Sequence, residues 1–182
     1  MTVDEAAARL KAGLPDAEVE VGRGQAGDPW IAVPRGSVVP VLRFVRDELG
    51  FAFLSSLSGV DDGASLSVVY HMARLDDADF LALKTTLDRG EATVESVSGL
   101  YGNAGWFERE AFDLFGIRFE NHGDLRRLMM PDDWEGHPLR KDYAPPAEYH
   151  GIPCDRPESH RVLDALFAGR EGSQAPPGTN TG

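Results

Sequence analysis

Apolar residues at helical spacing predict two helices within the first fifty residues. The first stripe comprises Ala6, Ala7, Leu10 and Leu14, with Asp4 as its cap and Gly13 and Pro15 as its stop. The second follows Ser37, a candidate cap, and comprises Val38, Val41, Leu42, Val45 and Leu49 before Gly50. Spacings of three and four residues give each helix one buried face. Two short strands, 17–21 and 30–33, are expected between these helices.

From Phe51 onward the apolar period becomes two, which predicts strands with one buried face. The alternating stretches are 51–57, 66–72 and 81–87, with a weaker one at 93–98. Turn residues at Asp61-Asp62-Gly63 and Asp76-Asp77 link these strands as hairpins. Helical spacing returns over 104–115 and stops at Gly116. The predicted fold class is α+β, a mixed, largely antiparallel sheet with helices on one face.

The last third of the chain is rich in proline. Of the twelve prolines in the whole chain, those at 131, 138, 145, 146, 153 and 157 fall in one short stretch. Proline lacks a backbone donor and fixes φ, so no long helix or central strand fits there. An extended arm that lies on another protein explains this composition better. We predict an α+β globular domain over 1–120, a partner-wrapping arm over 121–168 with a last helical turn at 160–167, and a disordered tail over 169–182.

Composition excludes several classes of function. Eighteen Lys and Arg against thirty Asp and Glu give a net charge of −12, which disfavours binding to nucleic acid or anionic lipid. The single cysteine, Cys154, excludes an internal disulfide and a cysteine-ligated iron–sulfur or zinc cluster. No apolar run approaches the ~20 residues of a transmembrane helix. The acidic start predicts neither a signal peptide nor a transit peptide.

A charged cluster lies on the helix predicted over 104–115, and its members are Glu108, Arg109, Glu110 and Asp113. Helical residues two apart point about 200° apart, so Glu108 and Glu110 cannot converge on one atom. Arg109 and Asp113 can pair at i, i+4, and Glu110 and Asp113 share a face. We expect these residues to fix the helix and the start of the arm. The alternative, a free-standing carboxylate-dependent enzyme, needs a pocket where Glu110 and Asp113 converge.

Other motifs are disfavoured as sites. His150, Cys154 and His160 suggest zinc, but they lie on a proline-rich coil without a second pair of ligands. Glycines 22, 24 and 27 imitate a phosphate loop, yet no helix follows them, so we expect a flexible turn. His71 falls on the polar side of a strand and is expected to be solvated. We predict no catalytic, cofactor-binding or metal-binding residue on this chain.

The arm concentrates residue types that anchor protein interfaces. Basic residues flank a proline-rich stretch that cannot fold alone, and this combination favours a partner over a solvated loop. The predicted partner contacts are Arg126, Arg127, Trp134, His137, Arg140, Lys141 and Asp142.

Three consecutive segments together carry a resemblance to a known family. They are Glu108-Arg-Glu-Ala-Phe-Asp-Leu-Phe-Gly-Ile117, His122-Gly-Asp-Leu-Arg-Arg-Leu128 and Pro131-Asp-Asp-Trp-Glu-Gly-His-Pro-Leu-Arg-Lys-Asp-Tyr143. Leu57–Asp61 and Leu66–His71 add less specific similarity. The chain resembles the C subunit, the 30-kilodalton-type subunit, of respiratory NADH:quinone oxidoreductase, also called complex I or NDH-1. The resemblance is specific from about Val94 to Tyr143.

The resemblance implies a role within a larger enzyme. It implies an arm that wraps the D subunit of the complex, contacts with its B subunit, and a place in the peripheral arm on the cytoplasmic side of the bacterial cell membrane. FMN and Fe–S clusters would be held by partner subunits, with NADH and quinone used at the level of the complex. No cofactor and no active site are then expected on this chain.

The chain departs from the family pattern at Gly123, where proline is usual, and over 151–160. The alternative within the same resemblance is the equivalent subunit of a membrane-bound energy-converting hydrogenase or an F420H₂ dehydrogenase.

Overall fold

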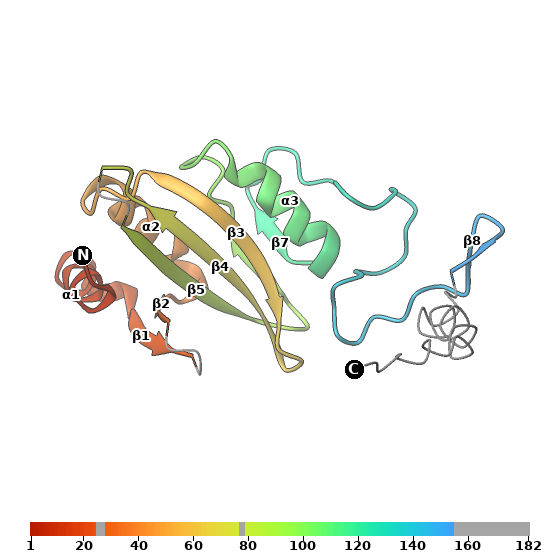
Figure 1. Ribbon diagram of the computed structural model, residues 1–182, viewed down its shortest axis with the longest axis horizontal. Coiled ribbons are helices and arrows are strands. Elements are labelled where there is room, and N and C mark those ends of the chain that lie inside the picture. Colours follow the sequence, from red (N-terminus) through yellow and green to blue (C-terminus); the bar gives the residue numbers. More distant parts are fainter. Residues whose placement is uncertain (25–27, 77–78, 155–182) are drawn as a thin grey trace, which may run out of the picture. The chain divides into compact units, whose positions relative to one another are not determined.

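The computed structural model describes residues 1–24, 28–76 and 79–154 (Figure 1). Its contacts divide the chain into two units, Met1–Ala144 and Pro145–Gly182. The predicted turn at 160–167 and the tail at 169–182 lie outside the described residues, so they stay predictions, as do the boundaries of the arm.

The first unit is built on a five-stranded sheet in the order β1-β2-β5-β4-β3. The strands are β1 Glu20–Arg23, β2 Pro29–Ala32, β3 Phe53–Asp61, β4 Ser65–Ala73 and β5 Phe80–Asp88. All neighbours are antiparallel except β2 and β5, which run parallel. One row across the sheet pairs Leu57, Tyr70, Leu83 and Ile31, and all four side chains are buried. The register thus places the predicted apolar faces in one core.

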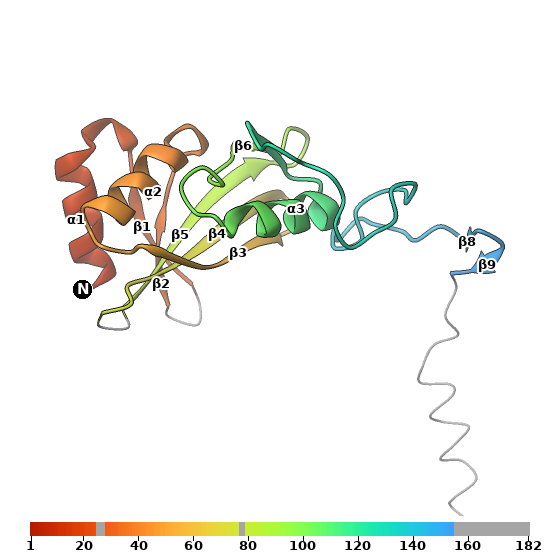
Figure 2. The same ribbon diagram turned by 90° about the horizontal axis from the view of Figure 1, so that it is seen from above.

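Three helices join that core: α1 Val3–Gly13, α2 Val38–Asp47 and α3 Ala104–Phe115. Figure 2 shows α1 and α2 side by side, and α3 further along the sheet. Leu10, Leu42 and Ala111 pack with the inward-facing strand residues, so the helices cover one face. A second, parallel sheet pairs β6 Thr93–Glu95 with β7 Arg118–Glu120. This arrangement confirms the predicted α+β class.

The structure corrects several local predictions. Thr2, not Asp4, caps α1, because its side chain accepts from the backbone of Glu5 in a capping box. Ser37 precedes α2 without a side-chain cap bond, and α2 ends at Asp47 rather than near Leu49. β7 was not predicted, because a strand of three residues is too short to show an alternation of apolar and polar positions. The bounds of α3 agree with the prediction, and Gly116 follows it in the left-handed conformation.

Gly22 lies in β1 rather than in a phosphate loop. A Cβ there would lie 2.5 Å from the Trp30 indole, so the strand needs glycine for that close approach. The rest of this glycine motif includes residue 27, which lies outside the described residues.

The second unit, as far as Cys154, contains one small hairpin of β8 Glu148–Tyr149 and β9 Ile152–Pro153. The rings of Tyr149 and His150 lie 4.2 Å apart in an edge-on contact. Across residues 1–24, 28–76 and 79–154, no helix is long and apolar enough to cross a membrane.

Candidate functional site

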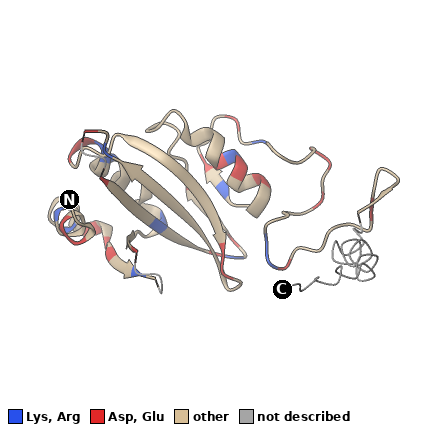
Figure 3. Cartoon of the chain, viewed as in Figure 1, with Lys and Arg blue, Asp and Glu red and all other residues tan. Residues whose placement is uncertain are grey.

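The site is formed by α3 and the segment 121–143, which contains neither helix nor strand. α3 packs against β3, where Gly59 leaves room for the Phe115 ring; a Cβ there would lie 2.5 Å from it. Figure 3 shows acidic and basic residues interspersed along α3. The predicted charged cluster therefore lies where the helix meets the segment.

Asp113 is the centre of this site. Its side chain is wholly buried, and Oδ2 accepts backbone N–H bonds from Leu128 at 3.0 Å, Met129 at 2.6 Å and Met130 at 2.8 Å. Oδ1 accepts from Arg127 Nη1 at 2.7 Å. Burial by itself raises the pKa of Asp113. The four donors together lower this pKa by more than burial raises it, so the pKa lies below its ordinary value. The carboxylate thus supplies the acceptor for the backbone N–H groups of three consecutive residues in a segment that has no helix or strand to pair them.

Arg127 extends the same network. Besides Asp113, its guanidinium donates to the carbonyls of Trp134 at 2.8 Å and Gly136 at 3.2 Å. One arginine therefore ties the helix to two further turns of the segment, using the several donors of its planar head.

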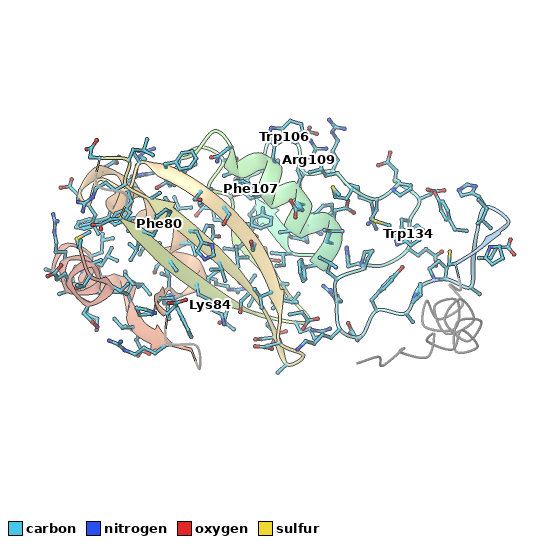
Figure 4. The ribbon with its side chains drawn as sticks, viewed as in Figure 1. Phe80, Lys84, Trp106, Phe107, Arg109 and Trp134 are labelled. Atoms are coloured by element: carbon cyan, nitrogen blue, oxygen red, sulfur yellow. The ribbon has the colours of Figure 1, made fainter. Side chains whose placement is uncertain are left out.

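The helical spacing suggested that Arg109 pairs with Asp113, but the structure shows other partners for Arg109. Its guanidinium instead donates to the carbonyls of Arg126 at 3.2 Å and Arg127 at 3.1 Å. It also stacks 5.0 Å from the ring centre of Trp106, which is 61% exposed (Figure 4). The segment brings a closer cation to Asp113, so the local pair predicted on the helix gives way to tertiary contacts.

Glu108 is the second buried carboxylate of α3. It accepts from the Ser96 hydroxyl at 2.6 Å and from the Val97 N–H at 2.7 Å. His122 Nε2 lies 3.8 Å from Glu108 Oε2 and bonds to the Gly105 carbonyl at 3.1 Å. Burial raises the pKa of Glu108, and the hydrogen bonds only partly oppose it. Glu108 thus anchors the loop before α3, whereas Asp113 anchors the segment after it.

The segment also caps the carboxyl end of α3. The helix carbonyls of Asp113, Leu114 and Phe115 accept from His137 Nδ1 at 2.9 Å, the Leu139 N–H at 3.0 Å and Arg140 Nε at 2.6 Å. Carbonyls at a helix end have no partner within the helix, so these donors replace water there.

A further contact ties the segment to the sheet. The Lys141 N–H donates to Asp61 Oδ2 at 2.8 Å, and Arg89 bridges Asp61 and Asp142. Arg89 and the Lys141 N–H keep the pKa of Asp61 well below its ordinary value. Trp134 Nε1 donates to the Tyr143 hydroxyl at 3.0 Å.

The structure thus gives the predicted partner contacts a role within the chain. Arg127, His137, Arg140, Lys141 and Asp142 bind α3 or the sheet. The Arg126 side chain is exposed and, among the residues that the structure describes, forms its ion pair with nearby Asp124 at 2.9 Å. Sequence reasoning missed Asp61, Arg89, Ser96 and His122, because no local spacing links them to α3. It also missed Trp106, Met129 and Leu139, because only the structure shows that these apolar side chains are exposed.

The carboxylates do not converge as an acid–base pair. Glu110 is exposed and Asp113 is wholly buried, so the shared face expected from spacing does not give them one environment. Within the described ranges, no three His, Cys, Asp or Glu side chains gather as metal ligands. His71 is exposed, as predicted. His160, part of the zinc alternative, lies outside the described residues.

Comparisons with known proteins agree with the sequence resemblance. The family described as respiratory-chain NADH dehydrogenase, 30 Kd subunit, matches residues 31–149. The NADH-quinone oxidoreductase C subunit of Roseiflexus sp. (strain RS-1) is 43% identical over 145 residues, which cover 77% of this chain and 83% of that relative.

Two solved structures share the fold. The trypsin-resistant fragment of Nqo5 has a TM-score of 0.55 at 26% identity and covers 67% of this chain and 95% of that fragment. A chain of an archaeal respiratory membrane complex, the membrane-bound sulfane sulfur reductase, has a TM-score of 0.64 at 21% identity, covering 98% of each chain. The family match spans α3, the segment 121–143 and most of the sheet. This chain therefore belongs to the family of 30 Kd subunits of respiratory-chain NADH dehydrogenase.

Proposed function

We propose that this chain is the cofactor-free C subunit in the peripheral arm of a proton-translocating NADH:quinone oxidoreductase. It packs against the B and D subunits, and its arm wraps the D subunit. Electrons pass nearby from NADH through FMN and the Fe–S clusters of partner subunits to quinone. The observation that carries this proposal is the family match over residues 31–149, which includes α3 and the segment bound to it.

The chemistry of the site supports a structural rather than a catalytic role. Glu108 and Asp113 are wholly buried and engaged by donors of their own chain, so neither faces a substrate. The bonds to Asp113 hold the segment 121–143, which has no regular structure, in one conformation, and the bonds to Glu108 hold the loop before α3. A segment ordered before binding loses less entropy on association, which favours a stable assembly.

The same segment displays apolar side chains that suit a partner surface. Met129 is 65% exposed although its own N–H is fixed to Asp113, and Leu139 is 52% exposed although its N–H is fixed to α3. Trp106 lies on the same helix, held by Arg109. Aromatic and apolar anchors on a rigid support are typical of the centres of protein interfaces.

The test is recovery of the assembly from gently solubilised membranes with the full chain tagged, read by mass spectrometry. We expect the B and D subunits together with the flavin- and NADH-binding subunits. Met129→Glu combined with Leu139→Glu should lower their recovery about tenfold or more, since a charge then enters an apolar contact. Ala8→Glu, an exposed position of α1, is the matched control and should recover the assembly fully.

Three results would contradict the proposal. Recovery of a hydrogenase or an F420H₂ dehydrogenase set would assign the chain to a sister machine. Recovery of no partner, with the chain monomeric, would contradict the proposal that the arm wraps the D subunit. Turnover by the isolated chain, abolished by Glu110→Gln, would favour the free-standing enzyme.

A further inference from the structure

His122 is a buried histidine at the start of the segment 121–143, and both of its ring nitrogens have partners. Its side chain is 6% exposed. Nδ1 accepts a hydrogen bond from the Asp124 N–H at 3.0 Å, and Nε2 bonds to the Gly105 carbonyl at 3.1 Å. A backbone N–H only donates and a carbonyl only accepts, so Nδ1 carries no proton and Nε2 carries one. These contacts select the neutral ring in a single tautomer.

The two nitrogens of this ring join two parts of the chain. Gly105 lies in the first turn of α3, whereas Asp124 belongs to the turn that follows β7. A Cβ at Gly105 would lie 3.4 Å from Nε2 of His122, so glycine there lets the ring sit close to the helix. His122 thus holds residues 121–124, which we call the hinge turn, against the amino end of α3.

We propose that His122 is a pH-sensitive switch: its unprotonated Nδ1 fixes the hinge turn, and protonation of Nδ1 releases the Asp124 N–H and lets the hinge turn rearrange. Histidine is the side chain whose charge changes between about pH 5 and pH 8. A protonated Nδ1 is a donor, and it would face the Asp124 N–H, a second donor, at 3.0 Å. Two donors cannot share a hydrogen bond, so the contact that fixes the hinge turn is lost.

The Nε2 side of the ring responds in the opposite way. Its N–H keeps the bond to the Gly105 carbonyl, because this nitrogen is protonated in both states. Glu108 Oε2 lies 3.8 Å from Nε2, and a carboxylate at that position attracts the charged ring. Tyr70 of β4, which interacts with Glu108, stays neutral because burial raises its pKa. Protonation therefore removes one contact of His122 and strengthens another, which confines the change to the hinge turn.

The remaining charged groups around the ring lie on α3 and on the segment itself. The pKa of Asp124 is lowered mainly by Arg126, with smaller effects of Arg109 and His122, so its carboxylate lies within electrostatic range of the ring. This carboxylate can accept from the protonated Nδ1 once the Asp124 N–H has turned away. It now pairs with exposed Arg126 at 2.9 Å. Proton uptake by a buried histidine thus frees a cation on the surface of the segment.

The hinge turn has the freedom that such a rearrangement needs. Gly123 does not have a left-handed φ, and no described atom lies within 4 Å of a Cβ built there. Neither backbone conformation nor space requires glycine, so its effect is to leave the turn flexible. The anchor that follows is separate, because the Asp113 carboxylate holds the N–H groups of residues 128–130. The switch therefore moves 121–124 and leaves 128–130 in place.

Nuclear magnetic resonance of the full chain tests this inference without any substitution. Imidazole nitrogen shifts report the protonation of each nitrogen of His122 between about pH 8 and about pH 5, and hydrogen exchange reports the protection of the Asp124 N–H. We expect a proton on Nε2 alone at the upper end. As Nδ1 gains a proton, protection at Asp124, corrected for the intrinsic effect of pH, should fall about tenfold, as for the loss of one hydrogen bond. Residues 128–130 should stay protected.

A variant and its matched control sharpen this measurement. His122→Asn places an acceptor oxygen near the position of Nδ1 and does not titrate, so protection at Asp124 should stay constant over the same range. His71→Asn replaces an exposed histidine of β4 and should keep the pH response of the parent chain.

A proton on Nδ1 at about pH 8, a ring that stays neutral to about pH 5, or constant protection of Asp124 through the titration would each overturn the inference. An equal loss at residues 128–130 would overturn it as well, because the whole segment would then open. A pH response retained in His122→Asn would have the same consequence. The measurement uses this chain alone, so its outcome does not depend on the proposed function.

Discussion

The two ends of α3 hold buried carboxylates with opposite titration behaviour. Glu108, toward the amino end, has a raised pKa because burial outweighs its hydrogen bonds. Asp113, toward the carboxyl end, has a lowered pKa although its side chain is equally inaccessible. The two residues lie five positions apart on one helix, so burial alone does not decide their charge.

The number and charge of the donors decide it. Asp113 accepts three backbone N–H groups and a guanidinium, whereas Glu108 accepts one N–H and one hydroxyl. A carboxylate with three or four donors is stabilised as the anion, and one with two neutral donors in an apolar setting is not. The anion at Asp113 therefore orders the segment 121–143, while Glu108 holds a loop by hydrogen bonds that do not require a full charge.

Removal of the Asp113 carboxylate is expected to have the largest effect. Asp113→Ala leaves the half-buried Arg127 without its anion and three N–H groups without their acceptor, which costs about 3–5 kcal/mol of unfolding free energy. Urea denaturation gives this value, and hydrogen exchange should show lost protection over 121–143 before the sheet opens. Asp124→Ala is the control and should leave both readouts unchanged. A loss below about 1 kcal/mol with exchange intact would refute the anchoring role.

Replacement of Glu108 should lower the unfolding free energy by less than replacement of Asp113, and the loss should depend on which residue is introduced. Glu108→Gln keeps the shape of the side chain. Its amide oxygen still accepts from the Val97 N–H, and its NH2 group donates to the Ser96 hydroxyl oxygen in place of the bond it accepted, so we expect a change within about 1 kcal/mol at neutral pH. Glu108→Ala removes the acceptors and leaves a cavity, at a cost of about 2–3 kcal/mol. Thermal and urea unfolding of both variants against the parent chain would separate charge from shape. Equal losses in the two variants would show that Glu108 acts as an anion.

The pH dependence of stability compares Glu108 and Asp113 by their protonation, with the shape of each side chain kept. The folded pKa of Glu108 lies above its ordinary value of 4.5, so its contribution is full below pH 4.5 and is lost as pH rises through the folded pKa. The folded pKa of Asp113 lies below 3.8, so its contribution is full above that pH and is lost as pH falls.

Urea midpoints measured from about pH 7.5 down to about pH 3.5 check these signs. The advantage of the parent chain over Glu108→Gln should grow as pH falls toward 4.5. Its advantage over Asp113→Asn should shrink below pH 3.8. Parallel curves for the two variants would remove the contrast between the two ends of α3.

The smallest effect is expected at Arg126. Its pair with Asp124 is exposed on both sides, and such pairs contribute little in water. Arg126→Ala should shift the Tm of the isolated chain by no more than about 1 °C, a change that calorimetry resolves. A fall in recovery of the assembly with an unchanged Tm would assign Arg126 to the partner surface, as the sequence predicts. A large Tm change would instead place it in the network around Asp113.

Local pattern alone located the three long strands and the three α-helices of the first unit, but it missed β7 and placed β1 only in part. The period of two found β3, β4 and β5, and helical spacing with Gly116 found α3 at its observed bounds. The family was also readable, because its signature residues lie close together between Val94 and Tyr143. These features depend on neighbours within a few positions, so the order of residues suffices to reveal them.

Only the tertiary structure decided how the charged residues are used. Asp113 pairs with Arg127, fourteen positions away, in preference to Arg109 on its own helix, because a segment without regular structure brings its N–H groups to that carboxylate. Arg140 caps the helix from twenty-five positions away. The sheet was equally undetermined in one respect, because alternation reveals that a strand has two faces, and only the packing of the helices decides which of the two is buried.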